Sequence, residues 1–340
     1  MKGDILSCKP WKSKTKPKKI LAIRFQALGD LMITLPYLQS LKEQETKVSI
    51  HLLTREENCE IPKNLKLFEK VIAIGGGRNA KAQFILSLFM LPYLLWQRYD
   101  VVIDLQNHRI SKIVRKLLWT KAWSEFDRAS RKLAGERTRL TIDALQIAKT
   151  FIATNFIQRN KLSVELLLKA NGWDGAKSLI ILNPAGAFTS RHWPTDNYIA
   201  FAKLWLVSHP STQFLVMGLG EQKLRTDYIK DALGHNLIDL TGLTTMAEAF
   251  ALVRLSTLTL SEDSGLMHVS WIQGVPTIAL FGSSPSYWSS PLGKWSRVFS
   301  SADLPCGDCF LKECKYGDVH CLTRVSPQRI ADEAEALLNP

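Results

Sequence analysis

Short apolar runs alternate with mixed apolar and polar stretches along most of the chain. In its first half, runs rich in β-branched residues at 20–25, 47–54, 70–74 and 99–106 are separated by stretches of helical character. Continuous apolar runs of this length are typical of parallel strands that are covered on both faces. The alternation therefore predicts a doubly wound parallel sheet.

A second block of the same kind follows. Strand-like runs begin at 178, 213, 236, 257 and 275, with helical stretches between them. A chain of 340 residues exceeds the usual size of a single core. We expect an α/β protein with two Rossmann-like domains, residues 19–170 and 178–340, joined by a Gly- and Asn-containing linker at 171–177. Their parallel sheets would face each other across a ligand-binding cleft, and the C-terminal helix could pack back on the first domain.

Other stretches are assigned by composition. A helix is predicted at 141–156 and another near 159–170, whereas 107–140 is rich in Arg, Lys and Trp and shows no regular period. The chain carries a net charge of +13, and its first nineteen residues hold seven lysines against one acid, Asp4. Residues 1–18 lack the apolar run of a signal peptide and are predicted to be a disordered basic arm. The arm is either simply solvated or attracted to an anionic surface.

The most apolar stretch is FILSLFMLPYLLW at 84–96. At thirteen residues it is too short to span a bilayer. It is either a core helix or an interfacial helix lying on a membrane, flanked by Lys81 and Arg98.

Four of the six cysteines cluster late in the chain, at 306, 309, 314 and 321. Their spacing leaves zinc binding open, but no second CxxC closes the pattern, so we expect free thiols and no metal.

Three strand-to-helix turns carry candidate chemistry. In SEDSG, the stretch from Asp263 to Gly265 opens a predicted helix, whose free N–H groups favour an anion such as phosphate. In NPAGAFTSRHWP, Arg191 could neutralise a departing diphosphate. Glu221 follows a strand and a glycine turn, where acids often bind ribose hydroxyls. Each feature also has a plain structural explanation, a helix cap or a surface charge, and His268 is expected to be a packed core histidine.

An acid also follows the first predicted strand. In RFQALGD, Asp30 follows a buried strand, and it is either a helix cap or a general base.

Taken together, these stretches resemble glycosyltransferase family 9, the heptosyltransferases of lipopolysaccharide core synthesis. The resemblance is carried, in order, by RFQALGDLMITLPYLQSLK, NPAGAFTSRHWP, DLTGLTTMAEAFALV and SEDSGLMHVSWIQGVPTIALFG, and it covers about residues 19–335. The tail CGDCFLKECKYGDVHCLTRVSPQRI resembles the heptosyltransferase II-like branch.

The resemblance implies a GT-B fold, with the acceptor in the first domain and the donor in the second. It implies inverting, metal-independent and cofactor-free transfer of heptose from ADP-heptose to a lipid-linked anionic saccharide. Asp30 falls at the proposed general base. The implied donor-binding residues are Thr189, Ser190, Arg191, Glu221, Asp263, Ser264, Gly265, Leu266 and Met267. The acceptor-binding residues that we expect are Gly29, Arg109, Lys112 and Arg115.

Two departures from the family pattern concern the donor. Arg191 replaces the usual lysine, and Gly186 and Ala187 stand where some members have hydroxyl residues, for which Thr189 and Ser190 could compensate. A different nucleotide-sugar donor is therefore an alternative. A non-catalytic protein that binds anionic ligands is a remote one, and no nucleic-acid-binding module is present in the sequence. We expect a cytoplasmic enzyme, peripheral on the inner leaflet of the inner membrane.

Overall fold

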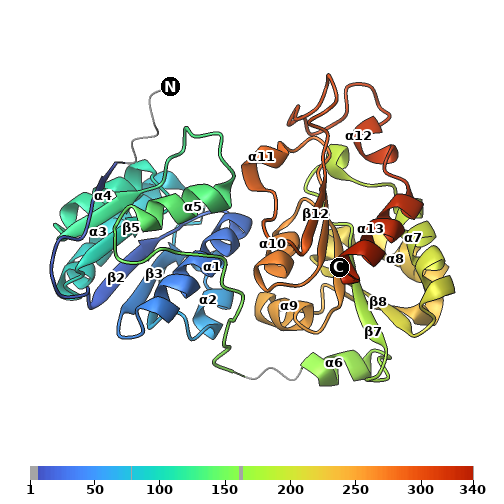
Figure 1. Cartoon of the computed structure of the whole chain (residues 1–340), viewed down its shortest axis with the longest axis horizontal. Helices are drawn as coiled ribbons and strands as arrows, with labels where there is room; N and C mark the ends of the chain where they lie inside the picture. Colours follow the sequence, from blue (N-terminus) through green and yellow to red (C-terminus); the bar gives the residue numbers. More distant parts are fainter. Residues whose placement is uncertain (1–6, 78, 161–163, 340) are drawn as a thin grey trace. The chain divides into compact units, whose positions relative to one another are not determined.

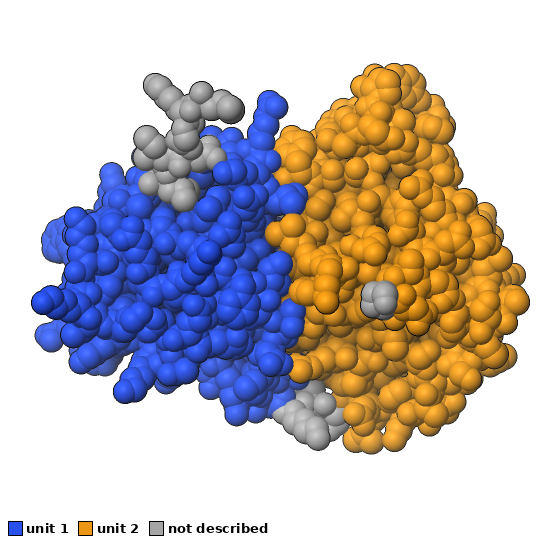
Figure 2. All heavy atoms as spheres, in the orientation of Figure 1, with its two compact units in different colours: residues 1–160 blue, residues 161–340 orange. Residues whose placement is uncertain are grey.

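The computed structural model describes residues 7–77, 79–160 and 164–339 (Figure 1). The chain forms two compact units, residues 1–160 and 161–340 (Figure 2). Each unit contains a six-stranded sheet covered by helices, which confirms the predicted α/β class.

The sheet of the first unit has the order β1-β6-β5-β2-β3-β4. All pairs are parallel except β1 with β6. Its strands are β1 (Cys8–Lys9), β2 (Lys19–Ile23), β3 (Ser49–Arg55), β4 (Lys70–Ile74), β5 (Val101–Asp104) and β6 (Ala122–Glu125). Its α-helices are α1 (Leu28–Gln44), α2 (Glu60–Asn64), α3 (Ala80–Trp96), α4 (Arg109–Leu117) and α5 (Ala134–Asp143).

The sheet of the second unit is parallel throughout, in the order β12-β11-β10-β7-β8-β9. Its strands are β7 (Ser178–Asn183), β8 (Thr212–Gly218), β9 (Leu237–Thr241), β10 (Leu258–Glu262), β11 (Thr277–Leu280) and β12 (Ser296–Phe299). Its α-helices are α6 (Val164–Ala170), α7 (Thr195–Ser208), α8 (Lys223–Leu233), α9 (Met246–Val253), α10 (Gly265–Ile272), α11 (Ser286–Ser289), α12 (His320–Thr323) and α13 (Pro327–Leu338).

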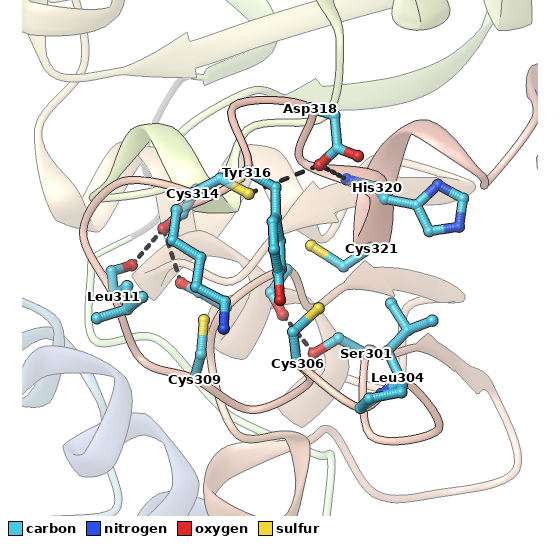
Figure 3. Close-up of a pocket in the computed structure, with 15 residues that line it drawn as sticks. Ser301, Leu304, Cys306, Cys309, Leu311, Cys314, Tyr316, Asp318, His320 and Cys321 are labelled. Carbon is cyan, nitrogen blue, oxygen red and sulfur yellow. Dashed lines mark hydrogen bonds between the residues drawn. The ribbon is translucent and has the colours of Figure 1, made fainter.

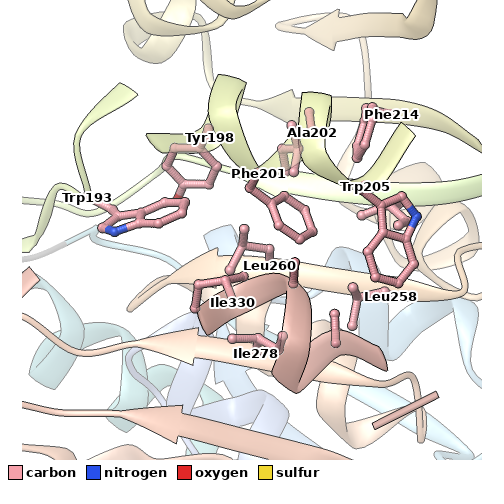
Figure 4. Close-up of a cluster of buried hydrophobic side chains, with 14 of the residues drawn as sticks. Trp193, Tyr198, Phe201, Ala202, Trp205, Phe214, Leu258, Leu260, Ile278 and Ile330 are labelled. Carbon is pink, nitrogen blue, oxygen red and sulfur yellow. The ribbon is translucent and has the colours of Figure 1, made fainter. Parts of the chain in front are cut away.

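A large aromatic cluster forms one side of the core of the second unit (Figure 4). Trp193 and Tyr198 are both fully buried, and their rings meet edge to face at 4.8 Å. The indole N–H of Trp193 donates to the carbonyl of Val325 at 2.9 Å. This anchor fixes the chain directly after Arg191.

Helix α13 completes the same cluster through Ile330, Ala331, Ala334 and Leu337. It packs on α7 in the second unit. The apolar face of the C-terminal helix is thus buried in the second unit, and the expectation that this helix packs back on the first domain stays a prediction.

The predicted basic arm is wrong for residues 7–18, whereas residues 1–6 lie outside the described part of the chain. Strand β1 pairs antiparallel with β6 and covers the edge of that strand. Farther along, the backbone N–H of Trp11 donates to Leu145, and Lys16 forms an ion pair with Glu45. Backbone pairing at an open sheet edge outweighs the local charge.

Three other boundaries differ from the prediction. The units divide before Lys161, and α6 packs on α9, so 171–177 is a turn within the second unit and not the linker. The helix predicted at 141–156 is wrong beyond Asp143, because α5 spans Ala134–Asp143 and the rest of that range has no helix. The stretch without a clear period, 107–140, contains α4 and β6 as well as most of α5.

Candidate functional site

Asp30 lies in the first turn of α1, directly beyond the carboxyl end of β2. Its Oδ2 accepts from the backbone N–H of Ala27 at 3.0 Å and is 2.8 Å from a guanidinium nitrogen of Arg24. Both contacts use Oδ2, so Oδ1 receives no hydrogen bond from the described residues. The Asp30 side chain keeps 39% of its surface exposed. One carboxylate oxygen therefore caps the helix, and the side chain stays partly open to solvent.

Two arginines that the sequence reasoning missed surround this acid. Arg24 and Arg137 are both buried and lie over the ring of Phe126, at 5.2 and 4.8 Å from its centroid. Burial lowers the pKa of Arg137, and the nearby charge of Arg24 lowers it further, whereas Asp30 acts in the opposite direction. Asp127 acts on Arg137 in the same direction as Asp30, so two arginines and two acids share this neighbourhood. The signal in the sequence was Arg24 itself, a charge that directly follows an apolar strand.

The expected acceptor residues do not form one group in the structure. Gly29 is in the first turn of α1, and Arg109 is exposed at the start of α4. Arg115 is buried, stacks 3.9 Å from the Trp123 ring and forms an ion pair with Glu125. This pairing makes Arg115 a support of the β5–β6 edge. Lys112 lines a separate cavity, described below.

Arg191 lies in a short 3-10 helix, Thr189–Arg191, that follows β7. One guanidinium nitrogen donates to Asp263 Oδ2 at 3.0 Å. The guanidinium also lies over the rings of Phe188 and Phe310, at 4.6 and 5.2 Å. With 11% of its side chain exposed, this cation is largely withdrawn from water and held in one orientation.

Asp263 and Ser264 precede α10, as the sequence predicted. Ser264 Oγ is the helix cap and accepts from the Met267 N–H, and the amide of Asn183 donates to the same oxygen at 2.7 Å. Because the cap takes the N–H of Met267, the N–H groups of Gly265 and Leu266 remain as donors of the first turn. They follow directly on Asp263, the carboxylate partner of Arg191, so the predicted residues at 263–267 form one group with that cation. His268 is buried and accepts from the indole of Trp271, as expected of a core histidine.

The hydroxyl groups of Thr189 and Ser190 have structural partners. Thr189 donates to the Lys312 carbonyl at 3.2 Å, and Ser190 donates to the Leu311 carbonyl. They attach the late cysteine-bearing loop to the Arg191 segment. The idea that they replace hydroxyl groups missing at Gly186 finds no support in these contacts.

A buried carboxylate, Glu262, binds the backbone on both sides of Arg191. It is fully buried at the end of β10, and Arg225 donates to its two oxygens at 2.8 and 3.0 Å. The backbone N–H groups of Gly186 and Trp193 donate to it at 2.7 and 2.8 Å. A Cβ at Gly186 would lie 2.9 Å from both Glu262 Oε2 and the Arg191 carbonyl, which explains the glycine there. Sequence reasoning passed over Glu262 because it ends an otherwise apolar strand.

Glu221 is exposed in a short 3-10 helix, Gly220–Gln222, just beyond β8. This is the predicted position for a ribose-binding acid at the carboxyl end of a strand.

The four late cysteines line one cavity of about 290 Å³ together with Tyr316, Asp318 and His320 (Figure 3). All six cysteines of the chain are free thiols. Burial raises the pKa of Cys321 to about 11, and the neighbouring thiols act in the same direction. Within the described ranges, no three His, Cys, Asp or Glu side chains are arranged to hold a metal ion.

Residues 92–320 match the sequence profile of glycosyltransferase family 9 (heptosyltransferase). Lipooligosaccharide heptosyltransferase 2 of Campylobacter jejuni serotype O:6 is 25% identical over 325 residues, covering 92% of this chain and 97% of that protein. Lipopolysaccharide heptosyltransferase 1 of Pseudomonas aeruginosa is 24% identical over 365 residues, covering 94% and 98%.

Solved structures are similar over nearly the whole chain. The glycosyl transferase family 9 structure from Veillonella parvula gives a TM-score of 0.76 at 18% identity, covering 94% of this chain and 97% of that one. E. coli ADP-heptose lps heptosyltransferase II gives 0.69 at 18% identity, covering 94% and 98%. The two parallel-sheet domains thus have the GT-B fold, and because the profile matches most of its length, the chain belongs to glycosyltransferase family 9, the heptosyltransferases.

Proposed function

We propose that this protein transfers a heptose from ADP-heptose to the inner core of lipopolysaccharide, with inversion at the anomeric carbon and without a metal ion or other cofactor. The observation that carries the proposal is the largely buried Arg191, held beside Asp263 and the first turn of α10.

The donor diphosphate binds at Arg191 and at the free N–H groups of Gly265 and Leu266. A guanidinium pairs bidentately with phosphate, and a helix N-terminus adds a favourable partial charge. Positive charge at this point stabilises the diphosphate as it departs, which is the contribution that a metal ion makes in other enzymes. When the donor is bound, the Asp263 carboxylate releases Arg191 and accepts hydrogen bonds from the sugar hydroxyls. Glu221 binds the ribose.

Asp30 acts as the general base through Oδ1. It takes the proton of the acceptor hydroxyl while that oxygen attacks the anomeric carbon, and the bond from that carbon to the diphosphate breaks, releasing ADP. Proton transfer accompanies formation of the new bond, which makes the attacking hydroxyl more acidic.

The acceptor is an anionic, lipid-linked saccharide. The guanidinium groups of Arg24 and Arg137, which both lie over the Phe126 ring, are the natural partners for its negative groups, and Arg109 is a further contact. Such an acceptor places the reaction on the cytoplasmic face of the inner membrane, with the enzyme bound peripherally. No helix in the described part of the chain is long and apolar enough to cross a membrane.

Mass spectrometry of a truncated, soluble core acceptor incubated with ADP-heptose and the protein tests this proposal. We expect a mass gain of one heptose, and Asp30→Asn should lower the rate by about 10²–10⁴-fold, the usual worth of a general base. Because Asn can still accept from the Ala27 N–H, this variant keeps the cap and removes the charge. Unchanged transfer by Asp30→Asn would return Asp30 to the role of a cap.

A different nucleotide-sugar donor is the second candidate, favoured by one observation. Arg191 lies over the rings of Phe188 and Phe310 and offers a fork where a lysine would offer a point charge. A panel of nucleotide sugars with the same acceptor separates the two candidates, since only the favoured donor gives a product mass.

A further inference from the structure

Helix α3 buries two polar side chains and exposes most of its large apolar ones, although Leu94 packs into the core. Gln83 and Ser87 are buried, and their side chains donate to the carbonyls of Gly77 and Phe84. Phe89 and Trp96, in contrast, are 79% and 73% exposed. The other large apolar side chains exposed on α3 are Phe84, Ile85, Leu86, Leu88, Tyr93 and Leu95. A water-soluble helix normally buries such residues, so this face is built to meet an apolar phase.

The stretch of chain that carries this face is mostly basic, and the exposed acids Glu56 and Glu69 precede it. Residues 70–124 contain just two acids, Asp100 and Asp104, of which Asp104 is fully buried. Asp100 is half-buried and accepts from the backbone N–H groups of Lys18 and Lys19. The same stretch contains nine basic residues: Lys70, Arg78, Lys81, Arg98, Arg109, Lys112, Arg115, Lys116 and Lys121. Both acids of this stretch are thus occupied, and its exposed charge is basic.

Helix α4 packs beside α3 on the same face of the first sheet (Figure 1). It presents Lys116 and leads to Trp119, whose side chain is 84% exposed. Lys9, Lys112, Lys116 and Trp119 line a cavity of about 520 Å³ together with Ser7, Arg115, Thr120, Trp123 and Glu125. Since Arg115 is paired with Glu125, the three lysines are the cations available to a ligand there. A basic cavity thus lies on the helix that packs beside the apolar helix α3.

We propose that the α3–α4 face docks on an anionic phospholipid bilayer, with α3 lying among the acyl chains at the interface and a lipid phosphate held in the lysine cavity of α4. The proposal rests on the proposed function for its biological sense, because the acceptor is lipid-linked, and names the surface that meets the membrane. Trp96 and Trp119 suit the boundary between headgroups and acyl chains, where an indole ring has both an apolar body and a polar N–H.

A second copy of this chain is the rival occupant of the apolar face. Two copies meeting at α3 would bring the same basic rims together, and like charges facing each other oppose association. An anionic bilayer has the complementary charge. The charge around α3 therefore favours lipid over self-association.

Flotation of the full chain with vesicles tests the docking. We expect binding to vesicles of phosphatidylglycerol and phosphatidylethanolamine, weak binding to neutral phosphatidylcholine vesicles, and loss of affinity with added salt. Phe89→Ser with Trp96→Ser should weaken binding by at least about tenfold, from the apolar area lost. Lys112→Gln with Lys116→Gln should weaken it by about fivefold per residue.

Matched controls come from the second unit. Leu224 and Val207 are 87% and 83% exposed, so Leu224→Ser with Val207→Ser removes two similarly exposed apolar side chains without touching α3. Lys203→Gln with Lys294→Gln removes two exposed lysines. Both control pairs should bind vesicles as the unchanged protein does. Circular dichroism confirms folding of each variant.

Three results would overturn the docking. Undiminished vesicle binding by the Phe89/Trp96 variant removes the role of α3, and undiminished binding by the Lys112/Lys116 variant removes the headgroup cavity. A dimer in solution that the Phe89/Trp96 variant converts to a monomer identifies self-association instead. Heptose transfer to a soluble acceptor, which should be intact in the Phe89/Trp96 variant, separates the two proposals: transfer without vesicle binding refutes the docking alone, and vesicle binding without transfer refutes the proposed reaction alone.

Discussion

The buried carboxylate of Glu262 offers the sharpest test of how the donor half of the site is built. Its two oxygens accept from Arg225 and from the backbone N–H groups of Gly186 and Trp193, all within 3.0 Å. Glu262→Gln preserves the shape, removes the charge and replaces one acceptor oxygen with an NH₂ group that faces donors. It leaves the guanidinium of Arg225 without its carboxylate in a largely buried position.

Breaking a buried ion pair by removing one partner costs about 3–5 kcal/mol. The lower end applies here, because Arg225 keeps 19% of its side chain exposed and still donates to the carbonyls of Pro184 and Trp193. For a unit of this size, about 3 kcal/mol corresponds to a drop of about 6–12 °C in the midpoint of unfolding.

Thermal unfolding followed by circular dichroism measures this drop. The matched control is Asp227→Asn, which breaks the Lys223–Asp227 pair, about half exposed on both sides. That change should cost less than about 1 kcal/mol. A second readout is the KM for the donor, which should rise in Glu262→Gln at temperatures where the variant is folded, because Glu262 holds the segment that carries Arg191. Equal midpoints for the two variants would refute our account of this network.

Two further predictions concern single residues. Arg191→Ala should lower kcat/KM for the donor by about 10²–10³-fold, and Arg191→Lys should recover part of that loss, because it restores the charge without the fork; equal activity of the two variants would mean that charge at this position is irrelevant. Burial lowers the pKa of His51 to about 4, and the charges of Lys19 and Lys70 act in the same direction. Below about pH 6.5 the unfolded chain therefore binds a proton at His51, whereas the folded chain binds it only near pH 4. Stability should therefore fall as the pH drops from about 6.5 to 4, less steeply in His51→Gln, and an NMR titration that finds the His51 ring charged at pH 6 would contradict this.

The α/β class was predictable because the chain is consistent at the local level. Buried parallel strands need continuous apolar runs, and those runs stand clear of the helical stretches around them. Strand β6 was missed because it alternates, with Ala122 and Ser124 buried and Trp123 and Glu125 half-buried, and a four-residue alternation in a basic stretch carries little signal. Strand β1 was missed because two residues pairing at an edge leave no pattern at all.

Composition alone could not predict which side of helix α3 is buried. A stretch that is apolar nearly all round has no polar face to show which side is buried, so its composition left both a core helix and an interfacial helix open. Only the packing shows that Gln83 and Ser87 face inward and that Phe89 and Trp96 face outward. The sequence held a hint in the two polar residues four positions apart, which mark one side of a helix.

The candidate site likewise combines residues that the sequence predicts with partners that only the fold reveals. Arg191, Asp263 and Ser264 could be found from sequence because each lies in a turn after a strand, where chemistry concentrates in such folds. The partners that position them could not, because Glu262, Arg225 and Phe310 come from distant parts of the chain and become neighbours only through the fold.

The cysteine-bearing loop also helps to position Arg191. It has little regular structure between β12 and α12, yet Phe310 covers the Arg191 guanidinium, and the Lys312 carbonyl accepts from the Ser190 N–H at 3.2 Å. A planar guanidinium stacks well on aromatic faces. Phe188 and Phe310 provide two such faces on the two segments that the Ser190 contact ties together. Arg191 is therefore one element of a local arrangement in which the loop, the aromatic pair and the cation fit one another.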